Sequence, residues 1–259
     1  MRKDCILGID IGTTGVKVVL FDKNGSILES EYREYPLYTL SFSMVEQDPK
    51  DWISSLIDAV RSLKGKTLSL SYDIVAIGID GQMHTSALLD KEGNILRRAI
   101  TWMDQRSKDI VKYMDEEQPG RDFIFKHTYN FPTTTYLLPN LLWIKEHEPN
   151  IYASIDKVLV AKDYVKYWLT GEIFTDPSDA SGTLLFDVKN LNWSSEMMSY
   201  FSIPNKWFPP VRASTEIIGS VTKEAASLLG ISEGIPVVNG CADHAATYIG
   251  GGVITKDEG

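Results

Sequence analysis

Three aspartates in this chain follow or end apolar runs that have the composition of buried strands. Asp10 lies in the run 5–11, Asp80 ends the run 74–80, and Asp243 comes shortly after the run 235–239. Ligands of α/β proteins collect beyond the ends of strands, so we expect these three carboxylates to share one cleft. A carboxylate at the end of a buried strand is unfavourable without a partner, and a Mg²⁺–phosphate group would supply one.

The segment Gly12-Thr13-Thr14-Gly15 directly follows the first of these strands. As a turn between two strands it offers free backbone N–H groups and two hydroxyls, which suit phosphate oxygens. It is not a Walker A loop, because the Gly-Lys-Ser/Thr ending is missing. A plain hairpin turn is the alternative, and the neighbouring Asp10 favours the phosphate interpretation.

Two further segments could recognise a sugar. In Gly81-Gln82-Met83-His84-Thr85, Gln82 and His84 could hydrogen-bond hydroxyl groups while Met83 covers an apolar face of the ligand. Trp102 follows a predicted strand and could stack on a carbohydrate. The alternatives are an irregular turn with a hydrogen-bonded histidine, and a tryptophan that belongs to the core.

Asp243 and His244 form the last candidate group. Asp243 could take the proton from an attacking hydroxyl, or it could cap the helix that begins at Ala245-Ala246, and both roles can hold together. Hydrolase chemistry with an Asp–His pair needs a nucleophile in a Gly-x-Ser-x-Gly segment, which this sequence lacks.

The elements that must position these residues alternate between strands and helices. Strands are predicted at 5–11, 16–21, 26–32, 74–80, 86–89 and 235–239, with Asn24-Gly25 as a hairpin turn. Asp48-Pro49 predicts the start of a helix with one apolar face. The middle of the chain, about 105–230, reads as mostly helical, with one helix from about 163 to 170 and a turn-rich loop at 176–179.

Composition limits the classes of function. The 259 residues carry a formal net charge of −9, without a cluster of Lys or Arg, so we expect no binding to nucleic acid or to membranes. No apolar run is long enough for a membrane span, and Asp4 and Asp10 interrupt any signal peptide, which favours a cytoplasmic location. Cys5 and Cys241 have neither disulfide nor metal-ligand spacing and are expected to be reduced and buried.

These motifs, in this order, resemble the FGGY family of carbohydrate kinases, and most closely its xylulokinases. The resemblance covers essentially the whole chain. Its most specific part is Gly81-Gln82-Met83-His84, where glycerol kinases carry Arg-Glu in place of Met-His. The other matching segments are Gly8 to Lys17, Glu46-Gln47-Asp48-Pro49, Leu88 to Trp102, Lys162-Asp163-Tyr164, Thr170-Gly171-Glu172 and Ser178 to Thr183.

The resemblance implies an α/β fold of the actin-like ATPase or ribonuclease H-like type, with a mixed central sheet flanked by helices. Residues 1–259 would form the N-terminal, sugar-binding domain, and a C-terminal nucleotide-binding domain would be absent from this chain, as the glycine run near its end also suggests. The implied reaction is ATP-dependent phosphorylation of a ketose or polyol, most closely D-xylulose to xylulose 5-phosphate. A homodimer is compatible with this assignment.

The resemblance also implies roles for individual residues. Asp243 would be the general base, and Asp10 would act near Mg²⁺ and the transferred phosphate. The remaining residues divide into two sets: Gly12, Thr13, Thr14 and Lys17 near the nucleotide phosphates, and Gln82, Met83, His84, Trp102, Asp243 and His244 around the sugar.

Two positions depart from the family pattern. His244 stands where xylulokinases usually have asparagine, which keeps another ketose or a polyol open as the substrate, and Asn140 stands where the family signature has lysine. Two other functions also remain as alternatives: a non-catalytic, actin-like sugar-sensing ATPase, and a sugar hydrolase that uses Asp10 and Asp243 as acid and base.

Overall fold

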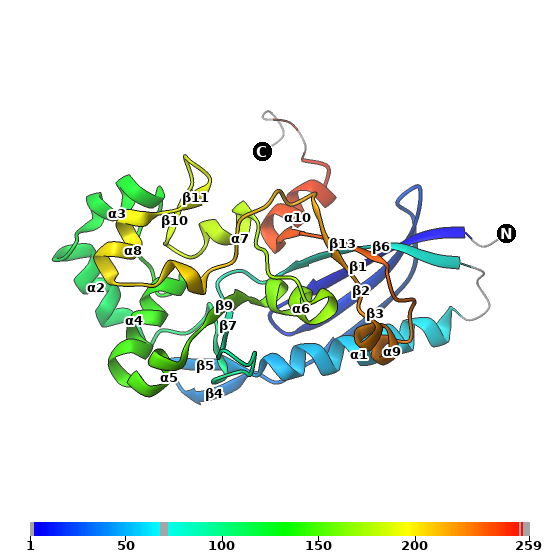
Figure 1. Ribbon diagram of the computed structural model, residues 1–259, viewed down its shortest axis with the longest axis horizontal. Helices are drawn as coiled ribbons and strands as arrows, with labels where there is room; N and C mark the ends of the chain where they lie inside the picture. Colours follow the sequence, from blue (N-terminus) through cyan, green and yellow to red (C-terminus); the bar gives the residue numbers. More distant parts are fainter. Residues whose placement is uncertain (1–2, 68–71, 254, 256–259) are drawn as a thin grey trace.

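The structure is a computed structural model that describes residues 3–67, 72–253 and 255. It is elongated, with a strand-rich part at one end and a helical part at the other (Figure 1). The main sheet has the order β12-β13-β6-β1-β2-β3, with β14 also paired to β6. Its strands are β1 (Lys3–Ile11), β2 (Gly15–Asp22), β3 (Ile27–Glu34), β6 (Tyr72–Gly81), β12 (Ile217–Ser220), β13 (Pro236–Val238) and β14 (Cys241–Ala242).

The sheet is mixed. β1, β2 and β3 form an antiparallel meander, whereas β6 runs parallel to β1, and β13 and β14 run parallel to β6. Along β1, every second residue from Cys5 to Ile11 is buried, which is the period of a strand with one face in the core. All six strands predicted from the sequence are present, although β13 is shorter than the predicted run 235–239.

The turn between β2 and β3 shows why the sequence predicts a hairpin there. Gly25 has a φ of +83°, which is favourable for glycine, and the Asp22 Oδ1 atom accepts hydrogen bonds from the backbone N–H groups of Asn24 and Ser26.

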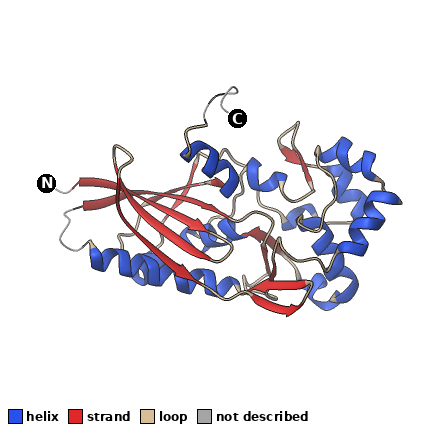
Figure 2. Cartoon of the chain, turned by 180° about the vertical axis from the view of Figure 1, so that it is seen from behind, coloured by secondary structure: helices blue, strands red, loops and turns tan. Residues whose placement is uncertain are grey.

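Helix α1 (Pro49–Lys66) covers one face of the sheet together with α6 (Ala161–Thr170) and α9 (Lys223–Leu229), as Figure 2 shows from behind. The Asp48 side chain caps α1 by accepting a hydrogen bond from the Lys50 N–H at 3.0 Å, as predicted. Trp52, Leu56 and Leu63 of α1 are fully or almost fully buried against the sheet. Helix α6 ends at Gly171, whose φ of +77° is the left-handed conformation of a glycine C-cap.

The helical part has a second, separate hydrophobic core, which includes Ile124, Leu138, Leu141 and Met197. It contains most of the remaining helices: α2 (Lys108–Glu116), α3 (Arg121–Thr128), α4 (Leu137–His147), α5 (Pro149–Ser154), α8 (Ser195–Phe201) and the 3₁₀ helix η1 (Asn205–Trp207). The short strands lie between the two parts or beside the helices: β4 (Tyr38–Ser41), β5 (Met44–Gln47), β7 (Ser86–Leu89), β8 (Ala99–Ile100), β9 (Lys157–Val160), β10 (Phe186–Asp187) and β11 (Asn192–Trp193).

Two predictions need correction here. The segment 176–179 is not a loop: Asp176 caps the short helix α7 (Pro177–Ser181) by accepting from the backbone N–H groups of Ser178 and Asp179. Cys241 is only partly buried, although both cysteines are free as predicted. The last helix is α10 (Asp243–Gly250). Among the described residues, no helix is both long and apolar enough to cross a membrane.

Candidate active site at the strand ends

The three aspartates meet at one end of the main sheet. Asp10 of β1 and Asp80 of β6 are direct partners in the parallel register, and Cys241 of β14, two residues before Asp243, is the next partner of Asp80. The structure therefore brings the three predicted carboxylates together at one edge of the sheet. This arrangement arises because parallel strands end on the same side of a sheet.

Burial and mutual repulsion shift the titration of these carboxylates. Burial, followed by the charge of Asp243, raises the pKa of Asp10, while its hydrogen bond with Asp80 opposes the rise. Burial, followed by the charges of Asp10 and Asp243, raises the pKa of Asp80 to about 7. Asp10 and Asp80 thus hold protons more strongly than separate carboxylates would. Such raised pKa values are typical of functional sites, and a bound cation could take the place of the proton.

Asp243 is the first residue of α10 and is partly exposed. The N-cap position belongs to Ala242, so the prediction that Asp243 caps this helix is wrong by one residue. Its Oδ1 atom accepts a hydrogen bond from the His244 N–H at 2.7 Å. The chain reaches this point through Gly240, whose φ is +75° and where an added Cβ would lie 1.9 Å from the carbonyl oxygen of Ile79.

The turn 12–15 lies beside Asp10. It is closed by a hydrogen bond of 3.0 Å from the Gly12 N–H to the Gly15 carbonyl, and the Thr14 hydroxyl bonds the Tyr32 hydroxyl at 2.8 Å. Lys17 is exposed and stands opposite Asp10 in the antiparallel register of β1 and β2, where its charge lowers the pKa of Asp10. Of the four residues predicted to contact phosphates, Gly12 and Lys17 therefore lie next to Asp10, and Thr13 and Thr14 lie in the same turn as Gly12.

His84 adopts a left-handed backbone conformation, with φ +68°, in the 81–85 loop. Its Nδ1 atom lies 2.7 Å from the carbonyl oxygen of Gly182, and its ring meets the Tyr136 ring edge-on. Because a carbonyl only accepts, Nδ1 carries the proton and Nε2 is left as an acceptor. Burial lowers the pKa of His84, so the ring is neutral at pH 7. The charges of Asp243 and His244 also act on the His84 ring, so the ring lies near the strand-end site.

The other amino acids predicted to contact the sugar differ in their accessibility to solvent. Trp102 is 39% exposed and His244 is exposed, whereas Met83 is partly buried. Gln82 is only 1% exposed, and both N–H groups of its amide donate to protein acceptors, the Gly12 carbonyl and Gln47 Oε1. This position does not fit the predicted contact between Gln82 and a sugar, because the amide faces the protein interior.

Gly182 is a residue that sequence reasoning did not assign to the site. An added Cβ would lie 2.7 Å from the His84 ring and 3.0 Å from the Met83 Cε atom. Only glycine leaves both side chains in place. The segment Ser178 to Thr183 was recognised in the sequence, but the contact with His84 joins residues 98 positions apart.

A buried cluster of charges behind the site was also missed. The Lys162 ammonium lies 2.7 Å from Asp163, 3.2 Å from Asp176 and 3.3 Å from Asp179, and Lys166 lies 2.9 Å from Asp163. All five side chains are at most 2% exposed. The cluster supports the strand end that precedes Asp243, since both lysines also bond the Asn239 carbonyl and the Ser178 hydroxyl accepts from the Ala242 N–H.

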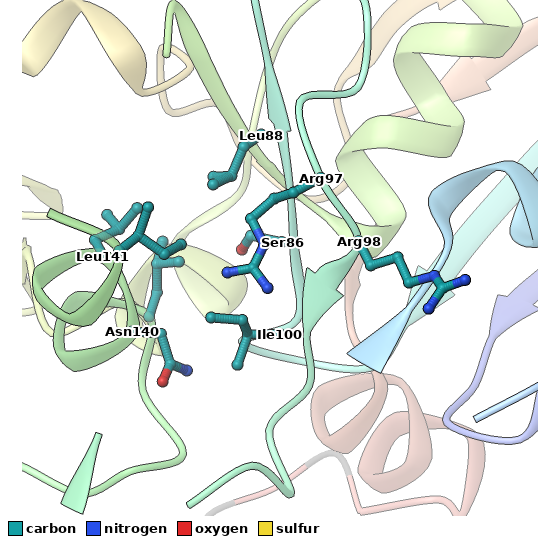
Figure 3. A pocket seen from close by; sticks show the side chains of 9 residues that line it. Ser86, Leu88, Arg97, Arg98, Ile100, Asn140 and Leu141 are labelled. Atoms are coloured by element: carbon teal, nitrogen blue, oxygen red, sulfur yellow. The ribbon is translucent and has the colours of Figure 1, made fainter. Parts of the chain in front are cut away.

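Asn140, the second departure from the family pattern, lies on α4 in the helical part. Its side-chain carbonyl accepts a hydrogen bond of 3.0 Å from the Ser107 hydroxyl. Together with Ser86, Arg97 and Leu141 it lines a small cavity of about 10 Å³, which has room for about one water molecule (Figure 3). None of the three strand-end aspartates lines this cavity, so Asn140 lies apart from the strand-end site.

The oxygen ligands at the sheet edge fit a magnesium–nucleotide complex better than a metal held by protein alone. In residues 3–67, 72–253 and 255, no three His, Cys, Asp or Glu side chains form a group that could hold a metal ion. Asp80 Oδ1 nevertheless has no hydrogen-bond partner in this part of the chain. Mg²⁺ is commonly held by one or two carboxylates together with substrate phosphates and water, and Asp10 and Asp80 could supply those carboxylates.

The mixed sheet with flanking helices, and a glycine–threonine turn beside strand-end aspartates, define an actin-like ATPase type of domain. Comparison with known sequences then gives the family. Residues 5–250 match the N-terminal domain of the FGGY family of carbohydrate kinases, and the chain belongs to this family. The fold class expected from the sequence is confirmed.

Individual relatives extend this comparison. The chain is 35% identical over 251 residues to a xylulose kinase of Bacillus subtilis, covering 97% of this chain and 50% of that protein. The structure of a ligand-bound xylulose kinase from Lactobacillus acidophilus superposes with a TM-score of 0.89 at 29% identity, covering 95% of this chain and 50% of that one.

A glycerol kinase with ADP from Plasmodium falciparum reaches a TM-score of 0.92 at 26% identity, covering 99% of this chain and 52% of that one. The chain thus spans about half the length of the relatives it matches.

Proposed function

We propose that the protein containing this chain transfers the γ-phosphoryl group of ATP to a hydroxyl of a ketose or polyol, with D-xylulose as the first candidate. The observation that carries the proposal is the convergence of Asp10, Asp80 and Asp243 between a phosphate-type turn and a loop that presents His84. The xylulose kinases among the relatives support the choice of sugar.

Asp243 is the group that accepts the proton of the attacking hydroxyl. It is accessible, and its position at the first turn of α10 places it where the helix dipole favours a carboxylate. In phosphoryl transfer the protein mainly positions the reactants and neutralises charge, so one correctly placed proton acceptor is sufficient on this side of the reaction.

The turn 12–15 and Lys17 hold the nucleotide phosphates through backbone N–H groups, the hydroxyls of Thr13 and Thr14, and one ammonium group. Asp10 and Asp80 would hold Mg²⁺, which when bound neutralises negative charge on the phosphates. Without a cation these two carboxylates share protons, as their raised pKa values indicate.

The sugar would lie between His84 and Trp102. The neutral His84 ring offers Nε2 as an acceptor for a sugar hydroxyl, and the exposed part of the Trp102 ring offers an apolar face. His244, exposed next to Asp243, is the residue we expect to select among sugars, and it keeps another ketose or a polyol as an alternative substrate.

The test is ADP release by the longest reading frame that contains this chain, measured against a panel of ketopentoses, ketohexoses and polyols. Asp243→Ala should abolish sugar-dependent turnover, whereas Asp58→Ala, which removes an exposed carboxylate from α1, should leave it unchanged. Turnover without sugar dependence, or turnover untouched by Asp243→Ala, would favour the sensing ATPase instead. Activity without any nucleotide would favour the hydrolase.

The 259-residue chain by itself should bind sugar weakly and should not turn over ATP, because most of the adenine site is expected in a second domain. Robust ADP formation by the purified chain would contradict this part of the proposal.

A further inference from the structure

The 81–85 loop and the 12–15 turn are joined by a closed ring of hydrogen bonds. Gln82 Nε2 donates to the Gly12 carbonyl at 3.0 Å, and the Trp102 indole N–H donates to the Thr13 hydroxyl at 3.0 Å. The Thr85 hydroxyl closes the ring: it donates to Gln82 Oε1 at 3.0 Å and accepts from the Trp102 backbone N–H at 3.3 Å.

A second buried amide reinforces the ring. Gln47 Nε2 donates to the Thr13 carbonyl at 2.6 Å, while Gln47 Oε1 accepts from Gln82 Nε2 at 2.8 Å and from the Trp52 indole at 3.1 Å. Gln47 and Gln82 are each 1% exposed, and Thr85 is fully buried. Two consecutive carbonyls of the turn, those of Gly12 and Thr13, are therefore held by amides that water does not reach.

We propose that Gln82, supported by Gln47 and Trp102, is a positioning residue that couples occupation of the sugar site to the geometry of the phosphate-binding turn. The proposal rests on the proposed function, since it assigns sugar to the 81–85 loop and phosphate to the turn. Gln82 itself touches neither ligand.

Gln82, Gln47 and Thr85 are buried, whereas the Trp102–Thr13 hydrogen bond of the ring is exposed. A buried hydrogen-bond donor that loses its acceptor costs about 1–3 kcal/mol, so the loop and the turn cannot move independently without leaving polar groups unpaired. Trp102 connects the proposed sugar site to the 12–15 turn, because its ring is partly exposed while its indole N–H donates a hydrogen bond to the Thr13 hydroxyl. A sugar that fixes the Trp102 ring therefore also fixes the Thr13 hydroxyl.

Coupling between the two sites is measured as the ratio of the affinity for nucleotide in the presence of sugar to the affinity in its absence. Binding of a non-hydrolysable ATP analogue with Mg²⁺ is measured by calorimetry, with and without the panel sugar that gives the highest kcat/KM, in the full-length protein. Coupled sites typically change each other's affinity about 5- to 150-fold, and we expect a ratio in this range for the unmodified protein. In Gln82→Leu the ratio should fall to about one, while the affinity for each ligand alone changes by less than about threefold, and sugar-independent ATP hydrolysis should become a larger share of turnover.

Asn140→Leu is the matched control. It removes a buried amide of the same chemistry, bonded to Ser107 in the helical part, and should lower stability without changing the affinity ratio. Trp102→Phe keeps an aromatic face but removes the indole N–H, so it should lower the ratio in the same direction as Gln82→Leu.

The proposal is overturned if Gln82→Leu retains the affinity ratio, or if Asn140→Leu loses it to the same extent. Failure of the proposed function is distinguished by the unmodified protein: if no panel sugar stimulates ADP release, the function itself is wrong, and the coupling proposal falls with it.

Discussion

Lys162 is the residue whose removal should reveal most about how the site is supported. Its ammonium is fully buried and lies within 3.3 Å of carboxylate oxygens of Asp163, Asp176 and Asp179. Burial alone would lower the pKa of Lys162, but the charges of these three aspartates outweigh it and raise the pKa. Burial, together with Asp176 and Asp163, raises the pKa of Asp179 to about 8. At neutral pH the Asp179 carboxyl therefore holds a proton while the Lys162 ammonium is charged.

Lys162→Met keeps most of the side-chain volume but removes the cation. Breaking a buried ion pair costs about 3–5 kcal/mol, and for a domain of this size that corresponds to a fall in melting temperature of about 6–20 °C. Asp163 retains Lys166, whereas Asp176 loses its ion-pair partner among the described residues.

The loss of stability caused by Lys162→Met should increase as pH rises. Without Lys162, three buried carboxyls face one ammonium, so a second carboxyl of the cluster should bind a proton in the folded state that it does not bind in the unfolded state. A carboxyl with a raised folded pKa loses stability as pH rises, by about 1.4 kcal/mol per pH unit for one proton. The difference between variant and unmodified chain should thus grow by about 3 kcal/mol from pH 6 to pH 8.

Thermal unfolding of the purified chain, followed by tryptophan fluorescence at pH 6, 7 and 8, measures both the fall in melting temperature and its dependence on pH. Lys206→Met is the control, because it removes an exposed ammonium that pairs with the accessible Asp156 carboxylate, and it should change the melting temperature little. A Lys162→Met chain that melts like the unmodified one, or whose deficit is equal at pH 6 and pH 8, would refute the account of the cluster.

Three further outcomes are expected. Asp243→Asn in the full-length protein should lower kcat by about 10²–10⁴ with a much smaller change in sugar affinity, because it removes a proton acceptor but keeps the shape; an unchanged kcat in steady-state assays would exclude Asp243 as the base. Gly240→Ala should destabilise the chain far more than Gly25→Ala in thermal unfolding: both have a positive φ, which costs an alanine about 1–2 kcal/mol, but only at Gly240 does the added Cβ meet a backbone oxygen, whereas Gly25 has open space. His84→Asn should keep the left-handed backbone and the hydrogen-bond donor to the Gly182 carbonyl but weaken sugar binding. Burial lowers the folded pKa of His84, so the unfolded chain takes up the proton first and the stability of the unmodified chain falls as pH drops below about 6.5. His84→Asn should therefore reduce the loss of stability on acidification. Equal pH profiles of melting temperature for the two chains would contradict this role of His84.

The predictions that succeeded from sequence depend on local signals. Alternating apolar residues gave the strands, Asp48-Pro49 gave the start of α1, and Gly171 gave the end of α6. Local signals also misled at two points: the turn-forming residues of 176–179 cap a short helix, and α10 begins at Asp243 rather than after it.

The buried polar groups could not be assigned in this way. Gln82 and Lys162 are residue types that usually lie at the surface, so the sequence suggests a ligand contact for one and gives no role to the other. Gly12, the partner of Gln82, lies 70 positions away in the sequence. Asp176 and Asn239, two partners of Lys162, lie 14 and 77 positions away.

The sequence by itself determined which residues end the strands and which segments turn, because these properties depend on a few neighbouring residues. It also determined that Asp10, Asp80 and Asp243 meet, since parallel strands end at a common edge. Only the tertiary structure decided that Gln82 faces the protein interior, that Trp102 bonds Thr13, and that two lysines lie buried behind Asp243. Those outcomes depend on which polar groups lose their water on folding, and that is set by packing between elements far apart in the chain.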